Sequence, residues 1–421
     1  MRSTLTSFAY DTAYALVAAA TSPWWMRRAR SGWAERFGRL DALPEKSRPR
    51  LLLHAVSVGE VNLTRPLVDR LRPRVEVVLS VTTDTGLARA RALYGGGDEG
   101  VCRVVRYPLD ASWSVRRFLD AVRPDAVALV ELELWPNFVR ACAARSIPVA
   151  VVNGRLSERS FARYRLGRAV IGRYFEQLAF AAVQDESYAA RFRAMGVAGE
   201  RCHVVGTMKW DAAEVSDSIA GSEDLARAMG IDRSRPLIVA GSTAPDEHAM
   251  LHSAVPAGVQ LLCAPRKPEW FDEAAAQMPG CVRRSETMRG GSGPGGADRF
   301  LLDTIGELRK AYALADVVVI GRSFGSLYGS DPMEAAALGK AVVIGPSVAD
   351  FRSTVEAMLR DGAIVQTNAE ELPGVLRSLI EDGARRREMA SMARECVLSH
   401  RGAADRHAAL ILELMGMGTR A

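Results

Sequence analysis

Residues 51–65 read LLLHAVSVGEVNLTR, in which an apolar run ends in a turn of small residues and a helix-like stretch follows. Continuous apolar character without alternation is typical of a strand that is buried on both faces of a sheet. The turn brings a carboxylate, Glu60, to the mouth of this strand. A strand, a turn and a helix in this order form the unit from which parallel sheets are built.

The same unit recurs along the chain, as Val-rich runs separated by amphipathic stretches. In the first half the runs occupy residues 51–56, 75–83, 103–108, 126–131, 148–153, 180–184 and 203–206. In the second half they occupy residues 236–241, 259–265, 316–321 and 340–345. Alternating strands and helices indicate parallel sheets covered by helices. The sequence therefore predicts an α/β protein with two Rossmann-like, doubly wound domains that face a cleft.

Composition and spacing divide the 421 residues into five predicted segments. They are an N-terminal membrane-associated segment (1–30), a first Rossmann-like domain (31–215), a linker (216–235), a second Rossmann-like domain (236–395) and a C-terminal helical tail (396–421). The predicted linker is polar and is interrupted by Gly and Ser, which are typical of irregular structure.

The N-terminus differs from the rest of the chain. Residues 4–25, TLTSFAYDTAYALVAAATSPWW, are apolar apart from Asp11, and the basic stretch MRRARSGWAERFGR follows. The apolar core is short for a membrane-spanning helix, but tryptophans beside arginines are typical of a membrane interface. We expect a membrane-associated helix with the remaining chain in the cytoplasm. The alternative is an amphipathic helix that packs on its own protein.

The charge balance excludes some classes of partner. The net charge is +6, from 55 basic and 49 acidic side chains, a surplus too small to indicate nucleic acid binding. It fits an anionic small substrate or an anionic membrane surface. The six cysteines contain no CxxC pair and the six histidines no HExxH pattern, so no metal site is predicted.

Carboxylates follow two of the predicted strands. In open α/β sheets ligands bind beyond the carboxyl ends of the strands, which is where Glu60 stands. Glu60 also opens a helix, so it is a helix cap or a general base. Glu131 and Glu133 follow another apolar run. They predict a charged ligand, although an arginine such as Arg155 is an alternative partner for Glu133.

Cations follow other strand ends. Lys209 stands in GTMKWD, and Arg266 and Lys267 stand in APRKPEW. A guanidinium in a cleft suits a phosphate or a carboxylate. Gly306 with Glu307, and Asp331 to Glu334, stand at predicted helix starts where a nucleotide could rest. Because there is no GxGxxG and no GxxxxGK[ST] motif, dinucleotide and P-loop chemistry are weakly supported.

Ten stretches spread along most of the chain resemble the 3-deoxy-D-manno-octulosonic acid (Kdo) transferases of lipopolysaccharide assembly. The matching stretches are HAVSVGEV, VTTDTG, ELELWPN, PVAVVNGRLSERS, QDESYAARFRAMGV, GTMKWD, GSTAPDE, PRKPEWF, DTIGELRKAYALADVVVIG and DPMEAAALGKAVVIGP. The resemblance implies the GT-B architecture, with the acceptor in the first domain and the nucleotide sugar in the second. It implies transfer of Kdo from CMP-Kdo to a lipid A precursor (lipid IVA) at the cytoplasmic face of the inner membrane. It implies neither a metal nor a cofactor.

The resemblance also implies residue roles. Glu60 matches the general base of an inverting transfer, and Glu131 and Lys209 match positions that support the transition state. The positions that match the CMP-binding motifs are Pro265, Arg266, Ile305, Gly306, Glu307, Asp331, Pro332, Met333 and Glu334.

The sequence departs from the family pattern in the second half. Ser330 and Asp331 stand where the family usually has histidine and asparagine, and Ala244 stands where a histidine is common. Lys267 and Trp270 replace another histidine and arginine. These departures concern the affinity and identity of the donor. The alternatives are therefore a GT-B transferase with another nucleotide sugar, or an inactive paralogue that binds glycolipid.

Overall fold

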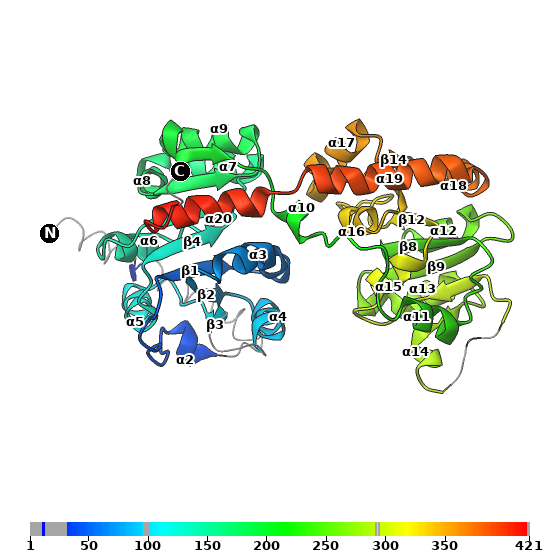
Figure 1. Ribbon diagram of the computed structural model, residues 1–421, viewed down its shortest axis with the longest axis horizontal. Helices are drawn as coiled ribbons and strands as arrows, with labels where there is room; N and C mark the ends of the chain where they lie inside the picture. Colours follow the sequence, from blue (N-terminus) through cyan, green and yellow to red (C-terminus); the bar gives the residue numbers. More distant parts are fainter. Residues whose placement is uncertain (1–10, 13–31, 96–101, 291–292, 294, 419–421) are drawn as a thin grey trace. The chain divides into compact units, whose positions relative to one another are not determined.

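The structure, a computed structural model, describes residues 11–12, 32–95, 102–290, 293 and 295–418 (Figure 1). The chain divides into two compact units, which are residues 1–212 with 401–421 (unit 1) and residues 213–400 (unit 2). Each unit contains one seven-stranded sheet. The predicted α/β class with two Rossmann-like domains of GT-B type is confirmed. The chain leaves unit 1 once and returns to it, so the predicted tail, 396–421, is divided after residue 400.

Unit 1 is built around β1, the strand of the opening stretch. The strand order is β3-β2-β1-β4-β5-β6-β7, and all neighbours pair in parallel. The strands are β1 (Arg50–Ala55), β2 (Glu76–Val81), β3 (Cys102–Arg106), β4 (Ala126–Val130), β5 (Val149–Gly154), β6 (Phe180–Val183) and β7 (Cys202–Val204). The order reverses between β1 and β4, so a crevice is expected at their carboxyl ends.

The helices of unit 1 cover both faces of this sheet. They are α2 (Trp33–Arg36), α3 (Val58–Leu71), α4 (Asp84–Tyr94), α5 (Ser112–Val122), α6 (Pro136–Ala143), α7 (Glu158–Leu166), α8 (Arg168–Glu176), α9 (Glu186–Met195), α10 (Lys209–Ala212) and α20 (Ala403–Leu414). Successive residues of β1 enter opposite cores: Leu51 and Leu53 pack in one cluster and Leu52 in the other. This two-sided burial explains the continuous apolar run, because no face of the strand meets water. On one face α20, the last helix, packs on α3 (Figure 1).

Unit 2 repeats the arrangement. Its strand order is β10-β11-β9-β8-β12-β13-β14, again parallel throughout, with the reversal between β8 and β12. The strands are β8 (Leu237–Thr243), β9 (Gln260–Pro265), β10 (Val282–Arg283), β11 (Arg299–Leu301), β12 (Val317–Ile320), β13 (Ala341–Ile344) and β14 (Ile364–Gln366). The helices are α11 (Ser222–Met229), α12 (His248–Ala254), α13 (Phe271–Gln277), α14 (Arg284–Thr287), α15 (Leu308–Leu314), α16 (Met333–Ala337), α17 (Arg352–Arg360), α18 (Leu372–Glu381) and α19 (Gly383–Ser399). The predicted linker, residues 216–235, lies within unit 2 and contains α11.

The predicted N-terminal segment, 1–30, lies outside the described residues apart from Asp11 and Thr12. One carboxylate oxygen of Asp11 accepts hydrogen bonds from the Ser112 amide (3.1 Å) and from Asn137 Nδ2 (2.6 Å). The Asp11 carboxylate therefore contacts unit 1 at the start of α5 and α6. Among the helices described here, none is long and apolar enough to cross a membrane.

Candidate active site

Glu60 lies in the first turn of α3, directly beyond the carboxyl end of β1. Ser57 is the N-cap, and its hydroxyl accepts from the Glu60 amide at 3.4 Å. In return the Glu60 carboxylate accepts from the Ser57 hydroxyl and the Val56 amide, each at 2.8 Å. This is a form of the capping box that S-x-x-E spacing produces. Burial raises the pKa of Glu60, the donors of residues 56 and 57 oppose the shift, and the charge of Glu131 adds to it.

Glu131 and Glu133 follow β4, which is the neighbour of β1 across the reversal in strand order. Glu133 accepts a hydrogen bond from Trp135 Nε1 at 2.8 Å. Burial raises the pKa of Glu133 to about 7, and the charges of Glu60 and Glu131 add to that rise. The fold therefore brings the three carboxylates together at one edge of the sheet. Clusters of carboxyl groups with raised pKa values are typical of proton-transfer sites.

Backbone strain gathers at the same edges. Glu131 has a φ of 63° and Asn153, at the end of β5, a φ of 52°. In unit 2 Ser242 and Arg322 each have a φ of 58°. Left-handed conformations are costly for residues other than glycine, and in folded proteins they gather at functional sites. All four residues lie at or just beyond the carboxyl ends of strands, so both edges are candidates for ligand contact.

Lys209 is the first residue of α10, which follows the edge strand β7. Its amide is 3.3 Å from the Thr207 hydroxyl. The amide before it, of Met208, donates to Asn153 Oδ1 at 3.0 Å, and α10 packs on α3, the helix of Glu60. Three predicted catalytic residues, Glu60, Glu131 and Lys209, thus belong to one unit and one edge of its sheet. Their catalytic roles stay predictions.

The predicted CMP-binding residues all lie in unit 2. Pro265 ends β9, and Arg266 follows it with its amide donating to the Thr243 carbonyl at 3.0 Å and its side chain exposed. Glu334, in α16, is also exposed, yet the surrounding protein limits hydration of its carboxylate and raises its pKa. The charge of Asp331 adds to this rise, whereas Arg309 and Arg266 oppose it. Arg266, Asp331 and Glu334 are therefore neighbours.

Glu307 has its own cation. The helix start predicted at Gly306 and Glu307 is present, with Gly306 at a φ of 92° and Glu307 as the N-cap of α15. Arg284 donates to both carboxylate oxygens of Glu307, at 3.0 and 3.2 Å, and the Thr304 hydroxyl donates at 2.7 Å. Burial opposes ionisation of Glu307, but these donors outweigh it and lower the pKa. Ile305 beside them is 73% exposed.

The segment around α16 holds the other predicted residues. Asp331 Oδ1 accepts from the Met333 amide at 2.8 Å, as an N-terminal cap does, although the N-cap position itself belongs to Pro332. Met333 is 1% exposed and packs in the interior. The Ser330 hydroxyl is buried and has no hydrogen-bond partner among the residues that the structure describes. A buried hydroxyl of this kind is ready to bind a ligand atom.

Sequence reasoning missed Glu247, the N-cap residue of α12. Its carboxylate is 1% exposed and accepts four backbone amides, those of Ala244, Arg322, Ser323 and Phe324, at 2.8 to 3.0 Å. Burial raises the pKa of Glu247, and the amide donors oppose the rise. The acidic residue in GSTAPDE was visible in the sequence. Three of its four donors lie more than seventy residues away, so the role was not.

Comparison with known proteins identifies the family. A family model described as 3-deoxy-D-manno-octulosonic-acid transferase (Kdo transferase) matches residues 31–212. The 3-deoxy-D-manno-octulosonic acid transferase of Bordetella pertussis is 32% identical over 406 residues, which cover 91% of this chain and 93% of that protein. This chain belongs to the Kdo transferase family. The Haemophilus influenzae protein of the same name is 28% identical, over 90% of both chains.

Solved structures agree with the fold. The UDP-GlcNAc 2-epimerase of Neisseria meningitidis has a TM-score of 0.59 at 13% identity, over 86% of this chain and 100% of that one. Staphylococcus aureus MnaA has a TM-score of 0.56 at 16% identity, over 88% of this chain and 98% of that one. At such identities the likeness concerns the fold alone.

Two departures from the usual Kdo transferase pattern contact each other. The Lys267 ammonium lies 4.8 Å from the centre of the Trp270 ring and 3.7 Å from Glu269. An ammonium over a tryptophan face is a cation–π contact, worth roughly 0.5–1 kcal/mol at an exposed site. Lys267 and Trp270 thus form a contacting pair on the surface of unit 2.

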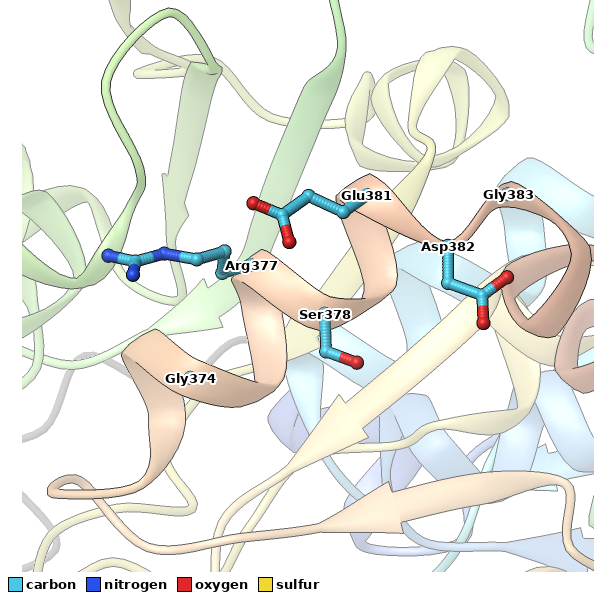
Figure 2. A pocket seen from close by; sticks show the side chains of 6 residues that line it. All are labelled: Gly374, Arg377, Ser378, Glu381, Asp382 and Gly383. Atoms are coloured by element: carbon cyan, nitrogen blue, oxygen red, sulfur yellow. The ribbon is translucent and has the colours of Figure 1, made fainter.

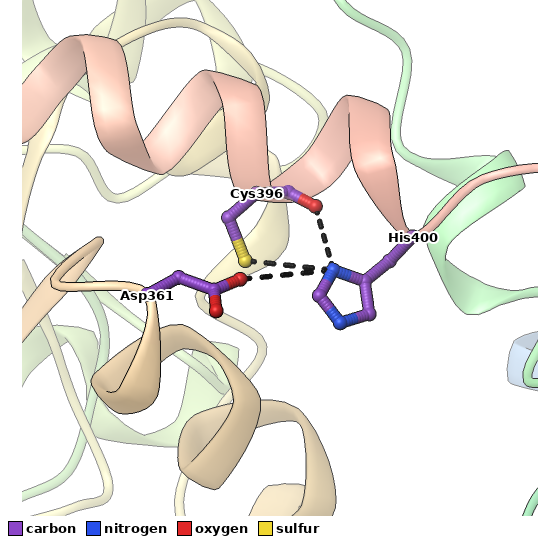
Figure 3. A group of neighbouring side chains, drawn as sticks. All are labelled: Asp361, Cys396 and His400. Atoms are coloured by element: carbon purple, nitrogen blue, oxygen red, sulfur yellow. Dashed lines mark hydrogen bonds and ion pairs between the residues drawn. The ribbon is translucent and has the colours of Figure 1, made fainter.

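A polar cluster in unit 2 joins Asp361, Cys396 and His400 (Figure 3). His400 Nδ1 is 2.9 Å from the Cys396 carbonyl, 3.9 Å from the Asp361 carboxylate and 3.8 Å from Cys396 Sγ. Burial, with Asp361 as its neighbour, raises the pKa of the Cys396 thiol to about 12. His400 is the C-cap residue of α19 and contacts one of its last carbonyl groups, so we interpret the cluster as the C-terminal cap of this helix.

A hollow of about 580 Å³ lies on α18 (Figure 2). Its lining residues are Gly374, Arg377, Ser378, Glu381, Asp382 and Gly383. Four of the six lie in α18, Asp382 joins α18 to α19, and Gly383 begins α19. We assign it no role in the chemistry of the family.

Proposed function

We propose that this chain transfers Kdo from CMP-Kdo to a lipid A precursor, lipid IVA, with inversion and with Glu60 as the general base. The observation that supports it best is the group of three carboxylates at the reversal point of the first sheet, two of them with raised pKa values, in a chain of the Kdo transferase family. A proton acceptor with a raised pKa is what deprotonation of a sugar hydroxyl needs near neutral pH.

In the proposed reaction the Glu60 carboxylate takes the proton of the acceptor hydroxyl. The freed oxygen forms a bond to the anomeric carbon of Kdo while the bond from that carbon to the CMP phosphate breaks, and CMP leaves with the electron pair. Lys209 and Glu131 support the developing charges. The negative charge of Glu131 raises the proton affinity of Glu60.

We propose that CMP occupies the strand edge of unit 2. Arg266 is exposed there and supplies a guanidinium for the phosphate. Glu334 has an exposed carboxylate for the ribose hydroxyls, and the backbone from Asp331 to Met333 is held by the hydrogen bond between them. The buried Ser330 hydroxyl adds an unused donor.

A basic surface favours an anionic acceptor and an anionic membrane. In α7 no residue is buried, and Leu166 and Val170 are 90% and 60% exposed. The exposed arginines around them are Arg159, Arg163, Arg165 and Arg168. Burial raises the pKa of Tyr164 in α7 and the charge of Glu133 adds to it, so this surface adjoins the carboxylates. Arginines beside exposed apolar side chains are typical of helices that lie on anionic lipid.

The deciding experiment is mass spectrometry of lipid IVA after incubation with the purified chain and CMP-Kdo. A mass increase of one or more Kdo units supports the proposal, and an unchanged acceptor with an active relative as positive control contradicts it. Calorimetry with CMP, UMP and ADP tests the alternative of another nucleotide sugar, because a preference for UMP or ADP would exclude CMP-Kdo as the donor.

The membrane role needs its own test. Co-sedimentation with vesicles of phosphatidylglycerol should fall at least tenfold when Arg163 and Arg165 are both changed to Glu, and phosphatidylcholine vesicles should bind little of either protein. Equal binding to both vesicle types, or unchanged binding of the double variant, would contradict the assignment of this surface. Removal of residues 1–25 measures the N-terminal contribution separately.

A further inference from the structure

The position of Lys209 poses a geometric problem. Lys209 follows β7, the edge strand, whereas Glu131 follows β4, and β5 and β6 lie between them. Three steps between neighbouring strands amount to about 14 Å at the usual spacing of ~4.8 Å. A lysine that simply continued from β7 would therefore lie too far from the carboxylates. The chain after β7 has to turn back across the sheet.

A hydrogen bond to Asn153 holds this returning chain in place. Asn153 belongs to the end of β5, the direct neighbour of β4, and its side-chain oxygen accepts the Met208 amide at 3.0 Å. Its backbone carbonyl accepts from Gln184 Nε2 at 3.0 Å. One hydrogen bond to an asparagine side chain thus brings the residue before Lys209 to within one strand of Glu131.

Asn153 makes this hydrogen bond in a strained conformation. Its φ is 52°, and the ladder between β5 and β6 is irregular between Val151 and Gly154. Such a bulge removes the amide of the extra residue from the ladder and re-aims its side chain. Asn153 is fully buried, so its freed amide needs an acceptor inside the protein.

His407 of α20 supplies that acceptor. His407 is fully buried, and its Nε2 lies 2.8 Å from the Asn153 amide. Its Nδ1 lies 2.7 Å from the Ala403 carbonyl, so Nδ1 carries the proton and Nε2 is free to accept. Burial lowers the pKa of His407 to about 4, which keeps the ring neutral in the cell.

A second contact joins α20 to the same loop. The Asp211 carboxylate, in α10, accepts from the Gly402 amide at 2.8 Å and from the Ala404 amide at 3.1 Å. These are amides at the start of α20, and an aspartate there acts as a cap supplied from elsewhere in the chain. The start of α20 and His407 therefore reach the loop of Lys209 from two directions.

We propose that His407 is a positioning residue for Lys209, acting through the strained turn at Asn153, so that the transferase site of unit 1 is complete only when α20 is docked. The catalytic meaning of this arrangement rests on the proposed function, whereas the structural relay does not. A misplacement of about 1 Å can cost ~100-fold in rate.

Three variants test the relay in the full-length chain. H407L removes the acceptor, H407Q offers an amide oxygen in place of Nε2, and I411A is a matched control that loosens the same helix without touching Asn153. Hydrogen–deuterium exchange of the amides of residues 205–212 reports the loop itself. We expect at least tenfold faster exchange there in H407L, near wild-type exchange in H407Q, and no selective change in I411A. A loop in H407L that exchanges as slowly as in I411A would overturn the proposal.

Kinetics with CMP-Kdo and lipid IVA complete the test. We expect kcat to fall roughly 10- to 100-fold in H407L with KM changed less than threefold, and to recover in H407Q. In a Lys209→Ala background, H407L should lower kcat little further, because both changes remove the contribution of a correctly placed Lys209. Fully additive losses would overturn the relay. If the wild-type chain shows no Kdo transfer, the proposed function fails, and the exchange data alone decide whether His407 positions the loop.

Discussion

In each unit the central strand leads into a helix whose start holds a glutamate, Glu60 after β1 and Glu247 after β8. Glu247 accepts four backbone amides, three of them from the loop that follows β12, and these occupy the roughly four acceptor sites of a carboxylate. Within the described part of the chain, the Glu60 carboxylate accepts hydrogen bonds only from residues 56 and 57 of its own turn, so some of its acceptor sites stay available. The same topological position thus holds two kinds of carboxylate. Glu247 holds the loop after β12 through backbone amides, and we call this arrangement a structural clasp. Glu60 is open to substrate.

This difference gives a criterion that position alone lacks. A carboxylate at a strand mouth is a candidate base when its surroundings raise its pKa and its lone pairs are not already consumed by the fold. Glu60 meets both conditions and Glu247 meets only the first. The predictions below challenge this contrast, from the largest expected effect to the smallest.

Glu60→Gln should reduce turnover on the order of 10²–10⁴-fold, because the amide keeps the volume and cannot take a proton. Melting temperature and CMP affinity should stay close to wild type. Ser57→Ala is the matched control: it removes the capping hydroxyl, costs about 1 kcal/mol of stability and leaves turnover nearly intact. A Glu60→Gln protein that melts early but transfers Kdo at the normal rate would make Glu60 a second clasp and remove the contrast.

Glu247→Gln should act on stability. The side-chain amide of glutamine would point N–H donors at backbone N–H donors. This should lower the free energy of unfolding by roughly 2–4 kcal/mol. Thermal unfolding should begin several degrees lower, and CMP binding should weaken because the loop of residues 322–324 is released. Asp246→Asn is the control, because it makes the same change from carboxylate to amide at the neighbouring exposed position. A Glu247→Gln protein as stable as Asp246→Asn would refute the clasp.

Glu133→Gln should change the pH dependence. The pKa of Glu133 is raised to about 7, so its carboxylate is protonated below that pH and its ionisation disfavours the folded state. Stability from this group is complete below pH about 4.5 and is lost as pH rises through 7. The variant should therefore lose less stability than wild type between pH 5 and 8. Thermal unfolding of the two proteins from pH 5 to pH 8 measures this difference, and equal losses of stability would show that Glu133 does not titrate in that range.

Arg284→Lys should have the smallest effect. It replaces the two-point contact with Glu307 by a single one, and we expect CMP affinity to fall about two- to fivefold by calorimetry. Arg289→Lys, at an exposed position just beyond α14, is the control and should change nothing. Equal effects of the two substitutions would show that the ion pair has no part in nucleotide binding.

The sequence predicted the elements whose signal is local. The strands around residues 51–56, 126–131 and 236–241 are long apolar runs, and all three are present as β1, β4 and β8. It missed β10, β11 and β14, which have only two or three residues each, too few to show a pattern.

The candidate site followed the same rule. Glu60 and Lys209 were visible because they adjoin local motifs. The acceptor role of His407 was not, because it depends on a bulge at Asn153, 254 residues earlier in the chain. The saturation of Glu247 likewise depends on a distant loop. Sequence patterns report what a residue can offer, whereas the number of its lone pairs already in use is a property of the tertiary structure.

The return of the chain to unit 1 sets an order of events during synthesis. Residues 1–212 leave the ribosome before all of unit 2, and α20 emerges last. At ~5–20 residues per second the first unit waits roughly 10–40 s for its final helix. Throughout that interval the bulged amide of Asn153 lacks its acceptor and one face of α3 lacks its cover. A released chain that ends at residue 400 should therefore hold a complete second unit and a first unit that chaperones and proteases still recognise.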